Sequence, residues 1–527
     1  MKKRIAALIL AAMMALSATA CNNNQGSSSG GGDNASGGGD STNNGEIVTI
    51  TYMTTGDIPA NRTDAALEAV NEILREKCNA ELKLHWIEWT DYLTNYNMML
   101  ASQTGNIDLV VTATDWLDAW PNSQDGGFMA LSEEMLKENA PRTWEQVDAL
   151  GHWDQCKLNG EIYLIPEDTY AQWINHGFMY RQDWATEAGL TEGVHSWEDM
   201  GTYLQYIKDN MPDVIPWDAK GKDISLTTQL AGGWQASHTD DISIDGFGVA
   251  LFYGESKDDP YTLSRYYLEG DELVNFAKNQ KAWADAGYWR TDVLNNEVDT
   301  RKELYEGLTG VDQHHTQTWY TTVRPEMDKR YPGSDVGFFY FGEETQNVVK
   351  MVITHGAMAV ANKSQHPDVA LQVYDEMRFN QDVYDLMQYG FEGEQYTINE
   401  ETNMLEWTEG YDNATNGVSF NFWAGRNDDL ERKVSTYAWE PYEKLVAEDY
   451  DKIAIEYPYG QFVPDKDAIT QLSNLSNVYT TYMPQIAFGK MTGDPEAYVA
   501  EFRQKLKEAG YEEALAEAER QLAEMYG

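Results

Sequence analysis

The sequence predicts an α/β fold divided into two large lobes, and three observations support this. Residues 46–114 alternate between strand-like and helix-like stretches, which is the order found in βαβ units. Beyond the first 45 residues about 480 remain, more than a single hydrophobic core usually holds. The chain is 42% hydrophobic and 12% aromatic, which is enough apolar material to fill two such cores.

The first elements follow from the spacing of apolar side chains. Residues 46–54 (EIVTITYMT) and 81–89 (ELKLHWIEW) alternate in the manner of strands. Between them, residues 63–78 place Leu67, Val70 and Leu74 at helical spacing. A second helix is predicted over 91–103, and the apolar run at 108–114 (DLVVTAT) predicts a buried parallel strand. Two βαβ units in succession predict a doubly wound sheet.

The loop after this third strand is the first candidate ligand site. Ligands of such sheets bind outside the carboxyl ends of the strands, where Asp115 and Trp116 emerge. A tryptophan and a carboxylate at the end of a strand suit a polar ligand with flat faces. This is the first indication of function.

The N-terminus predicts export and attachment to a membrane. Three basic residues precede an apolar run from Ile5 to Leu16, which is the layout of a signal peptide over residues 1–20. Cys21 follows where a bacterial lipoprotein signal carries its lipidated cysteine, and residues 22–45 are a Gly-, Ser- and Asn-rich linker. The alternative is simple secretion after the small residues Ala18 to Ala20. No other segment is apolar over the roughly 18–20 residues that span a bilayer.

Charge and cysteine content narrow the class of protein further. The chain has 38 basic and 86 acidic residues and a net charge of −48, which disfavours nucleic acid and anionic lipid as partners. Apart from Cys21, only Cys78 and Cys156 could form a disulfide, and buried free thiols are the alternative. Two stretches contain metal-binding residue types, but neither has the spacing of a known metal site. His314 and His315 have no third ligand at helical spacing, and the acidic run 240–246 departs from the twelve-residue calcium loop.

Several stretches, taken in order, resemble the family-one extracellular solute-binding proteins of ABC importers. They are NIDLVVTATDWLDAW (106–120), GGFMALSEEM (126–135), LNGEIYLIPEDTY (158–170), MYRQDWATEAGL (179–190), HSWEDM (195–200) and KMVITHGAMAVANKSQHPDVALQVYDEM (350–377). YGFEGEQYTI (389–398) and the tail KLKEAGYEEALAEAERQLAEMYG (505–527) resemble a narrower group, the large oligosaccharide-type lipoproteins with an extra C-terminal segment. The resemblance covers nearly the whole body of the chain.

The resemblance implies a two-lobed periplasmic-binding-protein-like fold of type II, in which two doubly wound lobes are joined by crossing hinge strands. The strand that ends at Pro166 and the apolar run at 349–361 suit the crossings. Lobe one is then expected to comprise residues 46–167 and 355–409. Lobe two is expected to comprise residues 168–354 and 410–527.

The same resemblance implies the function. The expected protein is a monomeric, lipid-anchored receptor on the outer side of the cytoplasmic membrane. It captures an oligosaccharide by hinge closure and delivers it to the permease subunits of an ABC importer. It needs no cofactor or metal and is not an enzyme. The alternatives are a peptide or other polar ligand, a sugar sensor without transport, and, remotely, a secreted glycoside hydrolase.

The candidate ligand residues come partly from the resemblance and partly from the position of aromatic residues beside turns. Asp115 and Trp116 match the first ligand loop of the family, and Trp173 follows the predicted first crossing. Trp234 lies in AGGWQASHTD, where the glycines indicate a turn, and Trp319 lies in HHTQTWY, as does His315. A further candidate in a predicted cleft loop is Glu392. Each tryptophan could instead fill a core, and Glu392 could be a solvated turn residue.

Overall fold

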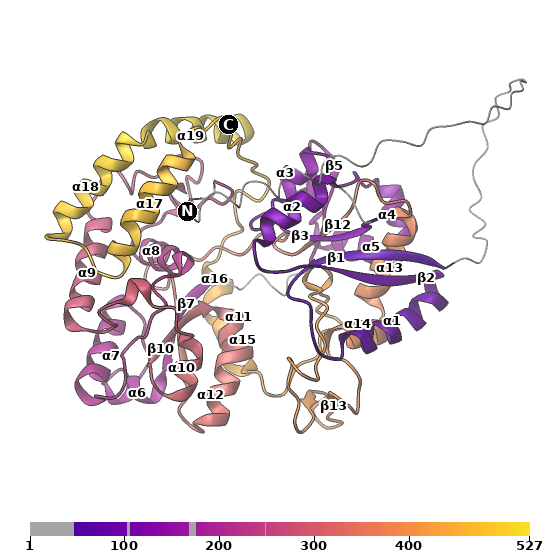
Figure 1. Ribbon diagram of the computed structural model, residues 1–527, viewed down its shortest axis with the longest axis horizontal. Coiled ribbons are helices and arrows are strands. Elements are labelled where there is room, and N and C mark those ends of the chain that lie inside the picture. The colour runs from indigo at the N-terminus through magenta and orange to yellow at the C-terminus, as the bar shows by residue number, and fades with distance from the viewer. Residues whose placement is uncertain (1–46, 103–105, 168–174, 248) are drawn as a thin grey trace, which may run out of the picture. The chain divides into compact units, whose positions relative to one another are not determined.

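The larger of the two main sheets, called here the first sheet, is built from strands far apart in the sequence. The computed structural model describes residues 47–102, 106–167, 175–247 and 249–527. Strands β1 (Val48–Thr55), β2 (Ala80–Ile87), β3 (Leu109–Thr112), β12 (Ala357–Val360) and β6 (Ile165–Pro166) are ordered β2-β1-β3-β12-β6 (Figure 1). β1 pairs in parallel with β2 and β3, whereas β12 is antiparallel to both β3 and β6. The strands predicted over 46–54, 81–89 and 108–114 are confirmed.

Burial explains why β3 and β12 lie at the centre of this sheet. All residues of both strands are buried, as expected for apolar runs covered on both faces. Helix α1 (Thr63–Cys78) buries Ala66, Val70 and Leu74, one turn apart. Helices α13 (Pro367–Phe379) and α14 (Gln381–Gln388) pack against α1, as Figure 1 shows.

The remaining elements of this half are short. They are α2 (Tyr92–Ser102), α3 (Ala119–Gln124), α4 (Glu133–Asn139), α5 (Pro141–Leu150), η1 (Trp153–Cys156), β4 (Lys157–Leu158), β5 (Glu161–Ile162), β13 (Tyr396–Ile398), β14 (Leu405–Trp407) and η5 (Trp423–Gly425). The core of the first sheet also contains Phe420, Phe422 and Ala424, which lie beyond the boundary expected at residue 409.

The second sheet has three strands, all antiparallel. β7 (His176–Arg181) lies between β10 (Val311–His315) and β11 (Val336–Tyr340). The two-lobed α/β fold is therefore present, but this sheet is not doubly wound in the parallel sense expected for both lobes. The expected βαβ pattern was read only from residues 46–114, and strand direction in the second lobe depends on long helical connections that local periodicity does not reveal.

Helices surround the second sheet and form a separate hydrophobic core. They are α6 (Gln182–Glu187), α7 (Trp197–Asn210), α8 (Ile224–His238), α9 (Glu272–Ala286), η3 (Val293–Asn295), α10 (Thr300–Glu306), α11 (Thr316–Thr318), η4 (Trp319–Val323), α12 (Arg324–Arg330), α15 (Trp439–Leu445), η6 (Val446–Tyr450), α16 (Asp451–Ile453), α17 (Leu472–Ala487), α18 (Pro495–Glu508) and α19 (Tyr511–Tyr526), with the small strands β8 (Ile242–Ser243) and β9 (Tyr253–Gly254). The C-terminal helices join this core through Leu475, Phe502 and Leu515.

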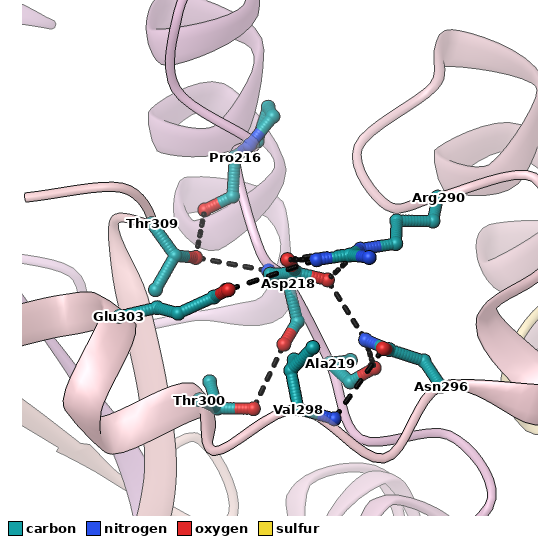
Figure 2. A network of polar contacts seen from close by, with 9 residues as sticks. All are labelled: Pro216, Asp218, Ala219, Arg290, Asn296, Val298, Thr300, Glu303 and Thr309. Carbon is teal, nitrogen blue, oxygen red and sulfur yellow. Dashed lines mark hydrogen bonds and ion pairs between the residues drawn. The ribbon is translucent and has the colours of Figure 1, made fainter.

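A buried ion pair fixes the loops beneath this second core. The carboxylate of Asp218, which is 1% exposed, accepts hydrogen bonds from Arg290 Nε at 2.7 Å and Asn296 Nδ2 at 2.8 Å (Figure 2). Its backbone N–H donates to Thr309 Oγ1 at 2.9 Å. Burial and the adjacent Asp218 carboxylate raise the pKa of Glu303 to about 7. Removing one partner of such a pair leaves a buried charge uncompensated.

Hydrogen bonds join segments that belong to the two halves. Glu167 N donates to Gly356 O at 2.8 Å, and a Cβ at position 356 would lie 2.8 Å from Glu167 Oε2. Trp120 Nε1 donates to Gly460 O at 3.0 Å, and Gln461 Nε2 donates to Asp154 O at 2.5 Å. The lobe boundaries given above stay a prediction.

Two further expectations concern cysteines and membrane spans. Cys78 and Cys156 are both free, and burial raises the pKa of each thiol, to about 12 for Cys78. Within the described ranges, no helix combines the length and the apolar character needed to cross a bilayer. Cys21 lies outside the described residues.

Candidate functional site

Four aromatic side chains gather at one edge of the first sheet. The ring of Trp116 lies 6.3 Å from that of Trp89, 6.0 Å from that of Tyr92 and 6.0 Å from that of Trp423, measured between centroids. Trp89 and Trp423 are 6.1 Å apart and tilted by 32°. We call Trp89, Tyr92, Trp116 and Trp423 the aromatic cluster. Trp89 is 44% exposed and the other three rings are half-buried, so the cluster reaches solvent.

Strand ends explain why these four rings meet. Trp89 follows the carboxyl end of β2, and Trp116 follows that of β3, the neighbour of β1 on its other side. Carboxyl ends of parallel strands lie at the same edge of a sheet, which is where ligands bind in α/β folds.

Trp423 is brought to this edge by Asn421. Asn421 O accepts from Tyr52 Oη at 3.0 Å and from Thr54 Oγ1 at 3.1 Å, and Asn421 Nδ2 donates to Thr55 O at 2.8 Å. Gly56 has a φ of +146°, and a Cβ there would lie 2.2 Å from Asn421 Nδ2, so only glycine permits this approach.

Asp115 and His355 form an ion pair beside the aromatic cluster. His355 Nδ1 lies 2.6 Å from Asp115 Oδ2, and Trp116 Nε1 donates to His355 O at 3.0 Å. Burial opposes protonation of His355, but the Asp115 carboxylate outweighs it and raises the pKa of the imidazole to about 9. The pair is therefore charged at neutral pH and fixes the orientation of the loop that carries Trp116.

Asp115 also borders a pocket between the two cores. Asp115 Oδ1 is buried and has no hydrogen-bond partner among the described residues. The pocket is lined by Asp115 and Trp120 from the first half and by Asp245, Tyr457 and Pro464 from the second. Asp245 is accessible to solvent but enclosed by neighbouring protein; this enclosure and the charge of Asp115 raise its pKa to about 7.

Three histidines lie at the edge of the second sheet. β7 begins at His176, which pairs with His315 at the end of β10, and His314 precedes it. The rings of His176 and His314 are 5.5 Å apart, and those of His314 and His315 are 4.2 Å apart. Burial lowers the pKa of all three, to about 3 for His176 and about 4 for His314, and the charge of His355 contributes for His315. They are neutral donors and acceptors at pH 7.

The structure places two of the predicted tryptophans in cores. Trp234 is 6% exposed and lies within helix α8, not in a turn, where it stacks on His238 at 3.8 Å. Trp319 is 5% exposed; its Nε1 donates to Val336 O at 2.8 Å and its ring stacks on Phe338 at 5.3 Å. A role in ligand binding for these two stays a prediction, and packing accounts for their positions.

The structure places some of the other predicted residues at or near the aromatic cluster and leaves others away from it. Asp115 and Trp116 lie at the aromatic cluster, and His315 lies near enough to His355 to feel its charge. Glu392 is exposed on the loop between α14 and β13, where its backbone pairs with Tyr396. Trp173 lies outside the described residues. The binding role of every one of these stays a prediction.

Sequence reasoning missed Trp89, Tyr92 and His355 and did not single out Trp423. The strand-end rule that found Trp116 could have found Trp89, since it is the last residue of the strand predicted at 81–89. The turn residues in FNFWAGRND indicate Trp423 only as one of several tryptophans in loops. Nothing local connects it to Trp89 or Trp116, because these partners precede it by more than 300 residues.

In the acidic run at 240–246, the carboxylate of Asp241 already accepts hydrogen bonds from other side chains of the protein. Asp241 Oδ2 accepts from Gln235 Nε2 at 2.5 Å and from Ser264 Oγ at 2.8 Å. Among the described residues, no group of three or more histidine, cysteine, aspartate or glutamate side chains is placed to hold a metal ion.

Two main sheets, each with its own large hydrophobic core, and a solvent-facing aromatic cluster at a strand-end edge define an α/β binding protein. Residues 59–382 match the family described as bacterial extracellular solute-binding protein, and the chain belongs to that family. Residues 458–526 match a domain of unknown function, DUF3502. Membership places the chain among extracellular or membrane-associated proteins.

Known proteins are similar over nearly the full length. A carbohydrate ABC transporter substrate-binding protein of Streptococcus pneumoniae serotype 4 is 24% identical over 512 residues, which cover 92% of each chain. The N-glycan transport solute binding protein NgtS of S. pneumoniae, in complex with Man1GlcNAc, has a TM-score of 0.65 at 20% identity and covers 90% of this chain and 99% of its own. An HMO-binding solute-binding protein of Bifidobacterium longum infantis has a TM-score of 0.62 at 15% identity, covering 90% and 98%. The structural likenesses show the fold.

Proposed function

We propose that this chain is the substrate-binding component of an ABC importer and that it captures an oligosaccharide at the aromatic cluster. The observation that carries this proposal is the group formed by Trp89, Trp116 and Trp423 beside the carboxylate of Asp115, whose side chain is 11% exposed. Indole faces pack on the C–H faces of sugar rings, and a carboxylate accepts from their hydroxyls. Solvent exposure of Trp89 leaves room for a ligand to stack.

Relatives support the ligand class. The similar protein of S. pneumoniae serotype 4 is named a carbohydrate transporter component, and NgtS was solved with Man1GlcNAc. Fold alone does not fix the ligand, so the site chemistry has to agree with these names. It does, because the site offers aromatic faces beside an unpartnered carboxylate oxygen.

Charges around the site favour a neutral ligand. Asp115, Asp118 and Asp245 border the pocket, the positive charge of His355 is taken up by Asp115, and Lys466 lies 3.7 Å from Asp118. An acidic sugar brought among these carboxylates would meet like charge at short range, which is unfavourable. We therefore expect neutral oligosaccharides to bind in preference to uronate- or sialate-bearing ones.

We propose further that a lipid anchor holds the protein at the membrane and that the bound sugar is delivered to a permease. Lipidation of Cys21 and the linker at 22–45 would hold the receptor near permease subunits on the outer side of the membrane. Residues 46–167 with 355–409 and residues 168–354 with 410–527 would act as the two lobes that close on the sugar, as a monomer. Ligand contacts available only in the closed form would shift the equilibrium toward it.

The testing experiment is a thermal-shift panel with the purified protein. Neutral oligosaccharides, sialylated or uronate oligosaccharides, and short peptides are compared at equal concentration, since a ligand that binds only the folded state raises the melting temperature. We expect stabilisation by one or more neutral sugars, and recovery of the sugar intact after incubation. Stabilisation by peptides alone would contradict the ligand class, and turnover of the sugar would contradict a binding role.

A further inference from the structure

Trp423 lies between two backbone carbonyls, each of which accepts a hydrogen bond from a buried tyrosine. Tyr52 Oη donates to Asn421 O at 3.0 Å, and Tyr374 Oη donates to Ala424 O at 2.6 Å. Both tyrosines are 0% exposed and belong to the hydrophobic core around the first sheet. The chain is therefore fixed two residues before Trp423 and one residue after it.

Asn421 also binds the end of β1 through its side chain. Its Nδ2 donates to Thr55 O at 2.8 Å, and its carbonyl accepts a second hydrogen bond, from Thr54 Oγ1 at 3.1 Å. The backbone φ of Asn421 is +49°, in the left-handed region that asparagine adopts more readily than most residues with a Cβ. With this conformation the carbonyl and the side-chain amide of one residue both reach β1.

Gly56, the residue after β1, connects this contact to a second ring of the aromatic cluster. A Cβ at position 56 would lie 2.2 Å from Asn421 Nδ2, so the asparagine amide rests directly on the glycine. Gly56 N donates to Ile87 O at 2.8 Å, two residues before Trp89. The end of β1 therefore positions both Trp89 and Trp423, whose ring centroids lie 6.1 Å apart.

The side chain between Asn421 and Trp423 packs into the core. Phe422 is 2% exposed, and its ring lies edge-on to Tyr52 at 6.2 Å and to Tyr374 at 6.1 Å. A Cβ at Gly425 would lie 1.8 Å from the Phe422 ring, so this packing requires glycine there. The backbone on both sides of Trp423 is thus held by the core, while the indole itself is half-buried and faces the aromatic cluster.

We propose that Asn421 is a positioning residue for sugar binding and that it acts by holding the Trp423 indole ready to stack on a sugar ring. This role rests on the proposed function, in which the aromatic cluster captures an oligosaccharide. A side chain that is ordered before the ligand arrives loses less conformational freedom on binding, which strengthens affinity. Asn421 acts through Trp423 and not on the sugar, since its carbonyl and its amide are both bound to β1.

The test compares Asn421→Asp with Asn139→Asp in the purified full chain. Asn139 is half-buried like Asn421, and its Nδ2 also donates to a backbone carbonyl, that of Met135 at 3.0 Å, but it lies at the end of α4. In both variants a carboxylate oxygen replaces the donor and repels the carbonyl. The proteins are labelled with fluorinated tryptophan, and the Trp423 fluorine signal is assigned with Trp423→Phe. In the sugar-free protein we expect this signal to shift or broaden in Asn421→Asp and to be unchanged in Asn139→Asp.

Sugar affinity gives the second readout, measured by calorimetry with maltotriose, mannotriose and chitotriose in turn. For a trisaccharide that binds the unaltered protein, Asn421→Asp should raise the Kd about tenfold and Asn139→Asp should leave it unchanged. In the Trp423→Ala background, Asn421→Asp should have no further effect, because a positioning residue acts only through the ring that it holds. A residue that merely stabilised the fold would change the Kd equally in both backgrounds.

Three results would overturn the role of Asn421. They are a Trp423 fluorine signal that is the same in Asn421→Asp and in the unaltered protein, equal effects of Asn421→Asp with and without Trp423, and equal effects of Asn421→Asp and Asn139→Asp. Normal binding of the trisaccharides by Trp423→Ala would instead contradict the proposed sugar site. The fluorine signal is recorded without sugar, so it decides whether Asn421 holds the ring whatever the aromatic cluster binds.

Discussion

The imidazole of His355 lies 2.6 Å from the carboxylate of Asp115, although 240 residues separate them in the sequence. The contact joins the loop after β3 to the segment that leads into β12. Trp116 Nε1 is held by the carbonyl of the same histidine, so one residue positions both the carboxylate and the central ring of the aromatic cluster.

This ion pair makes stability depend on pH. The folded-state pKa of His355 is about 9, above the value of 6.5 expected when unfolded. The stabilisation is therefore fully present below about pH 6.5 and is lost as pH rises through about 9. The shift corresponds to an upper bound on the order of 3 kcal/mol. Thermal melting of His355→Gln and the unaltered protein should differ most near pH 6 and converge above pH 9.

His195 is the matched control for this comparison. A hydrogen bond with Glu343 raises the pKa of His195 to about 9 as well, but far along the chain from Asp115. His195→Gln should leave sugar binding unchanged, whereas His355→Gln should weaken it by loosening the Trp116 loop. Equal melting differences for His355→Gln at pH 6 and pH 10 would contradict a charged pair.

Removing a ring of the aromatic cluster should weaken sugar binding with little loss of stability. Trp116→Ala and Trp423→Ala each remove a half-buried stacking surface, and we expect at least about a tenfold rise in Kd by calorimetry. Trp407→Ala, a half-buried tryptophan stacked on Tyr411 outside the cluster, is the control and should bind normally. Normal binding by both cluster variants would place the sugar elsewhere.

Trp234→Ala should lower the stability of the folded protein. Trp234 packs against Trp197 at 5.3 Å and Phe276 at 5.5 Å within the second core. Truncating a buried tryptophan typically costs about 3–5 kcal/mol, so a clear fall in melting temperature is expected. Unchanged melting would show that the ring is not packed as described.

Asp218→Ala should be among the most destabilising changes of a polar residue. It leaves the guanidinium of Arg290, which is 35% exposed, beside Glu303 without its principal acceptor, and losing hydrogen bonds between charged groups typically costs about 1.5–3 kcal/mol. Asp292→Ala, at an exposed position nearby, should cost little. Equal melting temperatures for the two variants would contradict the network in Figure 2.

The sequence predicted those parts of the fold that depend on local periodicity. Helix α1 begins and ends where its apolar spacing indicates, and β3 lies buried as its apolar run requires. Trp116 was found because a strand end fixes the position of the next residues. These features depend on neighbours within a few positions.

Features that depend on distant residues were not predictable. The Gly232-Gly233 pair before Trp234 indicated a turn, yet it lies inside α8. Glycine stands at position 233 because a Cβ there would lie 2.5 Å from the Phe341 ring, a contact that no local pattern reveals. Trp423 reaches the site through Asn421 and β1, and the antiparallel order of the second sheet depends on connections of more than 100 residues. No window of local sequence contains such information.

The most direct test of the central claim is a crystal structure with a bound neutral oligosaccharide. The account predicts a sugar ring within about 4 Å of the indoles of Trp89, Trp116 or Trp423, with a hydroxyl donating to Asp115. A sugar bound away from all three indoles, with Asp115 still paired only to His355, would contradict it.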